Sequence, residues 1–236
     1  MTQTNSSTSV LKSVAVIAAA TASAVFLYRV GRTFYRRRTR VERVYKKIDE
    51  VNAQDPRDPP QELEYGQRMT AMLEKYDAKA PDEVKIACRA QHIARWRIAR
   101  KEFPEGKAGY LKWRKTLYAM HAGLVKEIMQ GTGDFTEVEM DRTASLVAKQ
   151  WDLKTDTGAN AVEDCAALVF LQHYFPAFNE KLNEESKMVD IVRKTWVKMS
   201  AKGKEEALKL SLAPEQLEIV KKALASGLPA VPAEDD

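Results

Sequence analysis

The sequence predicts an all-α protein, and three observations carry this expectation. Apolar residues recur at i+3 and i+4 spacing along most of the chain, which is typical of helices with one buried face. Alternating β-branched residues, which would indicate strands, are nearly absent after residue 60. Proline and glycine clusters separate the periodic segments, as expected between helices. Hydrophobic residues make up 44% of the 236 residues, enough to bury the core of one domain.

The positions of these breaks predict the domain organisation. We expect a membrane anchor or organelle-targeting segment over residues 1–31 and a basic helix with a proline-rich linker over residues 32–60. A single helical domain should follow over residues 61–228, and an acidic tail over residues 229–236.

Composition limits the classes of function. The net charge is +5, but no acidic residue precedes Glu42, and that stretch holds Lys12 and six arginines. The remainder is close to neutral, so general nucleic-acid binding by the domain is not indicated. Cys88 and Cys165 both fall in predicted helices, which is typical of buried thiols in a reduced, intracellular protein.

The N-terminal arm contains an apolar run over residues 14–28. With its flanks it extends over residues 10–30, close to the roughly 20 residues that a spanning helix needs. A single-pass membrane anchor and an organelle-targeting segment, with the mitochondrion as first choice, both fit this acid-free, arginine-rich arm. A cleaved secretory signal fits less well, because the basic block follows the apolar run. An anchor would leave residues 29–40 on the cytoplasmic or matrix-like side.

The predicted helices within residues 32–100 follow from apolar residues at helical spacing and from the prolines that interrupt them. Residues 32–51 are expected to form a charged helix with apolar residues at helical spacing, ended by the three prolines within residues 52–60. Residues 61–76 should form the next helix. Residues 81–100 are then expected to form one helix of four or five turns, for which Pro81 suits the first turn.

The later helices are separated by loops over residues 100–109 and 152–159. Gly131 and Gly133 are expected to end the longest of them. The predicted helices cover residues 110–130, 136–151, 161–175, 185–200, 204–210 and 214–225.

The densest group of chemically useful side chains lies in the predicted helix over residues 81–100. Cys88, Gln91 and Arg95 share one helical face, and His92 lies on the adjoining one. Buried polar groups without partners are costly, so these side chains must be satisfied. A structural hydrogen-bond network and a ligand or metal site both remain open.

Several strings resemble an uncharacterised family, "domain of unknown function 4202". The resemblance covers residues 43–225 and implies no established activity. The strings are Tyr65-Gly66-Gln67-Arg68-Met69, Arg89-Ala90-Gln91-His92 with Arg95-Trp96, Gly109-Tyr110 with Trp113-Arg114, residues 163–171, and Lys194-Thr195-Trp196 with Lys198-Met199-Ser200.

The helix order also resembles a degenerate HD-domain phosphohydrolase, whose His, His-Asp and late Asp residues surround a divalent metal. Tyr65 stands where the first His would be, and Arg68 keeps the usual downstream Arg. Residues 91–95 align with the His-Asp motif of that superfamily. Asp164 matches the late Asp, and His121 matches an auxiliary His. Three of the four core ligand positions therefore carry other residue types.

This second resemblance implies a reduced divalent-metal site of His92, His121 and Asp164, because imidazole and carboxylate are suitable ligands. A polar network without metal is the alternative. In either case His92 and Asp164 are expected to lie close together inside the domain. The polar pocket would consist of Tyr65, Arg68, Gln91, His92, His121, Glu163 and Asp164.

Four arginines indicate an anion site, because guanidinium forks match phosphate oxygens. Ion pairing with Glu64, Glu163 and Asp164 is an equally good explanation. The arginines are Arg89, Arg95, Arg100 and Arg114.

The string Lys198-Met199-Ser200-Ala201-Lys202 is similar to a loop of class I aminoacyl-tRNA synthetases, and members of the resembled family can carry a glutamyl-tRNA synthetase label. That mechanism needs a nucleotide-binding α/β fold and a His-x-Gly-His signature, and the sequence provides neither, so we disfavour this function.

Two hypotheses remain. One is a site for a phosphorylated or nucleotide-like small molecule, with residual metal-dependent phosphohydrolase activity as its enzymatic form. The other is a non-catalytic accessory subunit of an organellar membrane complex, in which the residues of the HD-like pocket serve only as part of the protein core.

Overall fold

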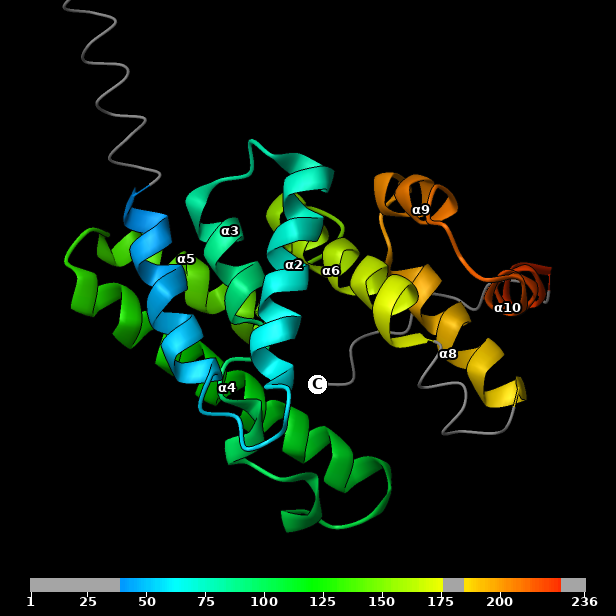
Figure 1. Ribbon diagram of the computed structural model, residues 1–236, viewed down its shortest axis with the longest axis horizontal. Coiled ribbons are helices and arrows are strands. Elements are labelled where there is room, and N and C mark those ends of the chain that lie inside the picture. Colours follow the sequence, from blue (N-terminus) through cyan, green and yellow to red (C-terminus); the bar gives the residue numbers. More distant parts are fainter. Residues whose placement is uncertain (1–38, 176–184, 226–236) are drawn as a thin grey trace, which may run out of the picture. The chain divides into compact units, whose positions relative to one another are not determined.

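The computed structural model describes residues 39–175 and 185–225, and within these ranges every regular element is helical (Figure 1). The all-α prediction is confirmed. After a helix over residues 39–52, the α-helices are α2 (Gln61–Asp77), α3 (Asp82–Ala90), α4 (Gly106–Thr132), α5 (Glu137–Ala148), α6 (Thr157–Val169), α8 (Glu185–Lys198), α9 (Ala201–Leu208) and α10 (Pro214–Ala225). Short 3₁₀ turns cover Arg95–Arg97 and Arg100–Glu102, and α6 runs into a π-helical turn over Phe170–Tyr174.

The chain divides into two units, residues 1–43 and residues 44–236. The second unit contains all the helices from α2 onward. The apolar run over residues 14–28 lies outside the described residues. Among the helices that are described, none combines the length and apolar character needed to cross a bilayer.

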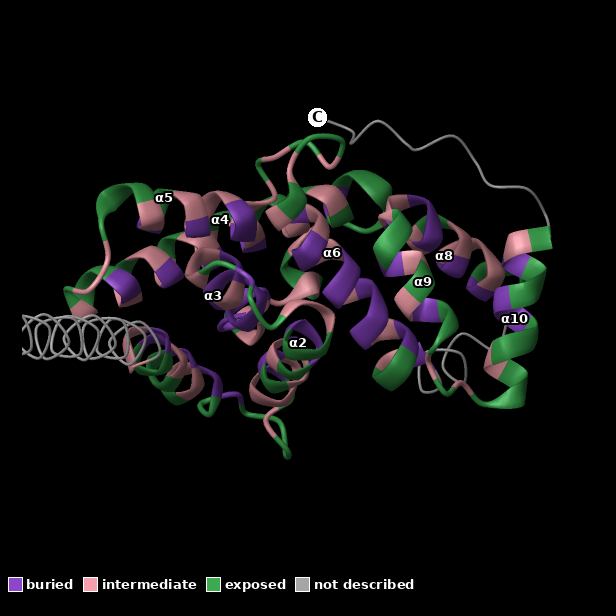
Figure 2. Cartoon of the chain, turned by 90° about the horizontal axis from the view of Figure 1, so that it is seen from above, coloured by how far each residue is buried: buried purple, intermediate pink, exposed green. Residues whose placement is uncertain are grey.

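Helix α6 is central to the second unit. It packs against α2, α3, α5, α8 and α9, and α3 packs against α2 and α5. Most α6 residues are buried, including Val162, Cys165 and Leu168, so the helix is largely purple in Figure 2. A helix that is apolar on nearly all sides is expected in a core. The two polar side chains that α6 carries into this core, Glu163 and Asp164, therefore need partners from the surrounding helices.

Several helix starts differ from the sequence prediction, and side-chain caps account for two of them. Helix α6 begins at Thr157 rather than residue 161, because the Asp156 side chain accepts a hydrogen bond from the Ala159 N–H. Helix α9 begins at Ala201 rather than residue 204, because Ser200 caps it. Helix α4 begins four residues before the predicted Tyr110 and ends at Gly133, whose φ of 67° suits a glycine.

The prediction of one helix over residues 81–100 is wrong. Helix α3 ends at Ala90, and Ala94 has a left-handed φ of 55°. Side chains from elsewhere satisfy the backbone of this turn: Asn52 Oδ1 accepts from the Ala94 N–H at 3.0 Å, and His121 Nδ1 lies 2.6 Å from the Ile93 carbonyl oxygen. These bonds replace those that a continued helix would make, so tertiary contacts override the helical preference of the segment.

Candidate functional site

The turn after α3 places His92 against α2. Its ring stacks on Tyr65 with centroids 3.9 Å apart, and its Nδ1 lies 3.3 Å from Glu62 Oε2. Burial, with smaller contributions from the charges of Arg95 and Lys149, lowers the pKa of His92 to about 4 against the opposing effect of Glu62. The imidazole is therefore neutral at pH 7, and Nδ1–H donates to the carboxylate. This tautomer leaves Nε2 as an acceptor on a side chain that is 31% exposed.

His121 of α4 lies behind His92, with ring centroids 6.5 Å apart. It is fully buried, and burial together with His92 holds its pKa at about 3. Because the ring is neutral and Nδ1 donates to the Ile93 carbonyl oxygen, Nε2 is an acceptor. Within residues 39–175 and 185–225, this buried nitrogen has no hydrogen-bond partner.

A group of cationic side chains surrounds the same region. Lys149, at the end of α5, pairs with Glu163 of α6, and its ammonium lies 5.6 Å from the Tyr118 ring centroid. Arg114 of α4 donates to the Tyr118 hydroxyl. Arg95 lies over the Trp113 ring, 4.7 Å from its centroid. We call Arg95, Arg114, Lys149 and Glu163 the cationic cluster.

The cationic cluster holds more positive than negative charge. Arg95 and Arg114 form no ion pair with a carboxylate anywhere in the part of the chain that the structure describes, since aromatic rings and a hydroxyl are their partners. Burial acts to raise the pKa of Glu163, but Lys149, Lys198 and Arg114 outweigh it and lower that pKa. Glu163 is thus ionised at neutral pH and forms its ion pair with Lys149, while Arg114 interacts with it electrostatically without forming an ion pair.

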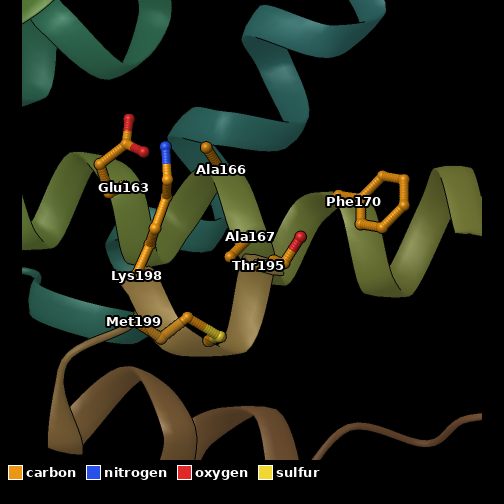
Figure 3. A pocket seen from close by; sticks show the side chains of 7 residues that line it. All are labelled: Glu163, Ala166, Ala167, Phe170, Thr195, Lys198 and Met199. Carbon is orange, nitrogen blue, oxygen red and sulfur yellow. The ribbon is translucent and has the colours of Figure 1, made fainter. Parts of the chain in front are cut away.

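A cavity of about 170 Å³ lies beside Glu163, between α6 and α8 (Figure 3). The carboxylate of Glu163 and the ammonium of Lys198 point the same way at one end of the cavity, and Phe170 lies at the other. The remaining lining is mostly apolar and consists of Ala166, Ala167, Thr195 and Met199. One end of the cavity is therefore charged, and it is the end that belongs to the cationic cluster.

Asp164 lies in a different environment from His92. It is fully buried and accepts hydrogen bonds from the Tyr76 hydroxyl at 2.7 Å, from the Ser200 N–H at 2.9 Å and from the Ser200 hydroxyl. His92 and Asp164 form no hydrogen bond or ion pair with each other. The expectation that they meet is not fulfilled, because Asp164 connects α2 and α6 to the α8–α9 junction.

The predicted metal site of His92, His121 and Asp164 is not formed. Across the described residues, no three side chains of His, Cys, Asp or Glu are grouped so that they could hold a metal ion. The reason is local: His92 already uses Nδ1 for Glu62, His121 uses Nδ1 for a carbonyl, and the Asp164 carboxylate is saturated by neutral donors.

The structure separates the four predicted anion-binding arginines. Arg95 and Arg114 lie in the cationic cluster. Arg89 instead pairs with Asp49, with Nε 2.8 Å from Oδ1, and Arg100 donates to the backbone carbonyls of residues 103, 104 and 106. The guanidiniums of Arg89 and Arg100 are therefore used in contacts that stabilise the fold.

Two further residues of the predicted polar pocket have local partners. The Gln91 side-chain amide donates to the Ala87 carbonyl at 3.3 Å. Arg68 pairs with Glu64 one helical turn away and lies over the Tyr174 ring, 5.1 Å from its centroid. Of that predicted pocket, Glu163 belongs to the cationic cluster, and Tyr65, His92 and His121 lie close to it.

Sequence reasoning missed Lys149, Glu62 and Tyr118. Glu62 precedes Tyr65 by three residues on the same helix, so helical spacing was a usable signal for it. Lys149 follows the last turn of α5 in a left-handed conformation with φ of 57°, where a sequence gives no indication of its direction.

The synthetase-like string has a structural role. Met199 is buried, and the Ser200 hydroxyl accepts from the Gly203 N–H at 3.0 Å while it donates to Asp164. The string therefore forms the junction between α8 and α9, where packing accounts for Met199 and capping accounts for Ser200.

Comparison with known proteins gives one match. Neither the curated proteins nor the solved structures include a match to this chain. A family model does match residues 42–220, which is most of the chain. The protein therefore belongs to the family described as "Domain of unknown function (DUF4202)".

Proposed function

We propose that the cationic cluster binds the phosphate group of a small phosphorylated molecule. The observation that carries this proposal is the charge excess around Glu163. Arg114 of α4 and Lys149 at the end of α5 act on Glu163, and Arg95 acts with Lys149 on the neighbouring His92. Neither arginine forms an ion pair with a carboxylate among the described residues. A phosphate would supply the missing negative charge.

The guanidinium groups of Arg95 and Arg114 are chemically suited to a phosphate ligand. A guanidinium presents a planar fork that binds two oxygens of a phosphate at once. The rings of Trp113 and Tyr118 fix the two guanidiniums by cation–π contact, so little side-chain entropy would be lost on binding.

The neighbouring histidine adds a hydrogen-bond acceptor. Glu62 fixes the ring of His92 through Nδ1, and the neutral Nε2 can accept a proton from a hydroxyl or from a protonated phosphate. Because the described residues hold no group of three metal ligands, the proposal concerns binding and includes no metal-dependent step.

Calorimetric titration of the full-length chain with inorganic phosphate tests the proposal. Arg95→Gln should weaken phosphate binding about tenfold to a hundredfold, since a hydrogen bond to a charged group contributes about 1.5–3 kcal/mol. Arg97→Gln is the matched control, because Arg97 lies on the same 3₁₀ turn with an exposed side chain. Absence of phosphate binding by the wild type would contradict the proposal and favour the accessory-subunit hypothesis.

We further propose that residues 10–30 attach the chain to an intracellular membrane, with the mitochondrion as the first compartment to examine. The support is the apolar, acid-free composition of that segment. A spanning helix would resist both high salt and carbonate extraction, whereas release by carbonate would indicate targeting or peripheral binding instead.

A further inference from the structure

We infer that the phosphorylated ligand carries a single small ring or short apolar group, and that the cavity between α6 and α8 holds it. This inference rests on the proposed phosphate site and specifies the class of its ligand. It places the phosphate among the cations of the cationic cluster and the organic part against Ala166 and Phe170.

The lining of the cavity is suited to an apolar group. Helix α6 contributes Ala166 and Ala167, whose small side chains leave the space open, and Phe170 lies at the far end. Met199 adds a flexible thioether, which adapts to ring surfaces. Apolar walls with a few polar groups at the rim are the usual composition of small-molecule pockets.

The size of the cavity limits the ligand. Its volume is about 170 Å³, comparable to cavities of roughly 150 Å³ that take up benzene. One six-membered ring fits this space. The inference therefore names a monoester with one ring or a short chain, and it disfavours a nucleotide.

Glu163 determines the orientation of the ligand. Its carboxylate lines the cavity and also pairs with Lys149, so it lies at the boundary between the two regions. A phosphate inside the cavity would meet the opposing charges of Glu163 and Lys198, whereas on the far side of Glu163 it would meet the two cations Arg114 and Lys149. A hydroxyl or amino group on the ligand could donate to Glu163 or to the Thr195 hydroxyl, which itself donates to the Ile191 carbonyl oxygen.

The test compares phenyl phosphate with inorganic phosphate by calorimetry on the full-length chain. Wild-type protein should bind phenyl phosphate at least about tenfold more tightly, because the phenyl ring leaves water for apolar walls. Ala166→Leu fills the cavity and should reduce this ratio to near one, with inorganic phosphate binding unchanged. Ala71→Leu, at an exposed position on α2, is the control and should keep the ratio.

A smaller substitution guards against a folding defect. Ala166→Val fills less of the cavity and should reduce the preference for phenyl phosphate partially, so the test stands even if the leucine variant does not fold. A graded loss along alanine, valine and leucine supports the inference.

The outcomes separate this inference from the proposed function. Equal affinity for the two ligands in wild-type protein, or an unchanged preference in Ala166→Leu, would overturn the inference and leave phosphate binding intact. Tighter binding of adenosine monophosphate than of phenyl phosphate would also overturn it. Failure to bind any of the three would remove the proposed function itself.

Discussion

Glu163 and Asp164 are neighbours in the sequence, yet α6 directs their carboxylates into two different environments. Asp164 is fully buried, and its partners are hydroxyl and amide donors that carry no charge. Glu163 is 12% exposed, lines a cavity and is surrounded by cations. Successive residues on a helix point about 100° apart. The Asp164 carboxylate therefore lies in a buried hydrogen-bond network, whereas the Glu163 carboxylate lies beside a cavity.

The difference indicates which polar group maintains the fold and which is available for a ligand. The donors to Asp164 come from α2 and from the α8–α9 junction, so its hydrogen bonds join three parts of the unit and leave no room for a ligand. The cations that act on Glu163 are Lys149, Lys198 and Arg114, which come from the end of α5, from α8 and from α4. Arg114 forms no ion pair with a carboxylate among the described residues. Substitutions in the first group should change stability, and those in the second should change binding.

The largest effect is expected from Asp164→Ala. It removes a buried carboxylate and leaves the Tyr76 and Ser200 donors unpaired, so the free energy of unfolding should fall by about 3–5 kcal/mol. Asp141→Ala, whose side chain is exposed and pairs with Lys126, should cost less than about 1 kcal/mol. Urea denaturation measures both, and similar losses would show that the Asp164 network is not structural.

The next effect depends on pH. Burial lowers the pKa of His92 to about 4 and that of His121 to about 3, from an ordinary value near 6.5. Below pH 6.5 the unfolded chain therefore binds protons that the folded chain does not, and stability falls as pH decreases towards 4. The loss by pH 4 should reach roughly 3 kcal/mol for each of the two histidines, because each pKa unit corresponds to about 1.4 kcal/mol.

A variant isolates the histidine contribution from that of the carboxylates. His121→Asn keeps a donor for the Ile93 carbonyl oxygen but does not titrate, so its stability should decline less steeply between pH 6.5 and pH 4. His173→Asn alters an exposed side chain and should follow the wild type closely. Identical slopes for wild type and His121→Asn would show that His121 is not held neutral.

A third effect tests how closely α9 approaches Asp164. A Cβ at Gly203 would overlap the Asp164 carboxylate, so Gly203→Ala should cost about 2 kcal/mol by overpacking. In an Asp164→Ala background the same change should cost much less, since the obstructing carboxylate is gone. A double-mutant cycle on unfolding free energies measures this coupling, and additive costs would argue against the contact.

The sequence predicted some helix boundaries accurately but failed wherever the structure depends on contacts between distant residues. Apolar spacing and proline breaks located α2 and α10 to within about a residue, because those signals are local. They failed after Ala90, where Asn52 and His121 hold a turn that only tertiary structure provides. The pairing of His92 with Asp164 failed for the same reason, since a sequence does not show which face of α6 meets which neighbour.

The smallest stability effect is expected in the cationic cluster. Burial lowers the pKa of Arg114, but Tyr118, Tyr110 and Glu163 outweigh it and raise that pKa, so the fold favours this charge. Arg114→Met removes the charge and the hydrogen bond to the Tyr118 hydroxyl but keeps much of the side-chain volume, so unfolding free energy should fall by about 0.5–1.5 kcal/mol. Lys115→Met, at the adjacent exposed position on α4, is the control. A loss above about 2 kcal/mol in Arg114→Met would assign this arginine to the fold instead.

The central claim is that the cationic cluster is a phosphate site, and the most direct measurement is the unfolding temperature at increasing phosphate concentration. A ligand that binds only the folded state raises stability by RT ln(1 + [L]/Kd). Wild type and Lys115→Met should therefore show the same rise with phosphate at constant ionic strength, and Arg114→Met should show little or none. An equal rise in all three proteins, or no rise in the wild type, would contradict the claim.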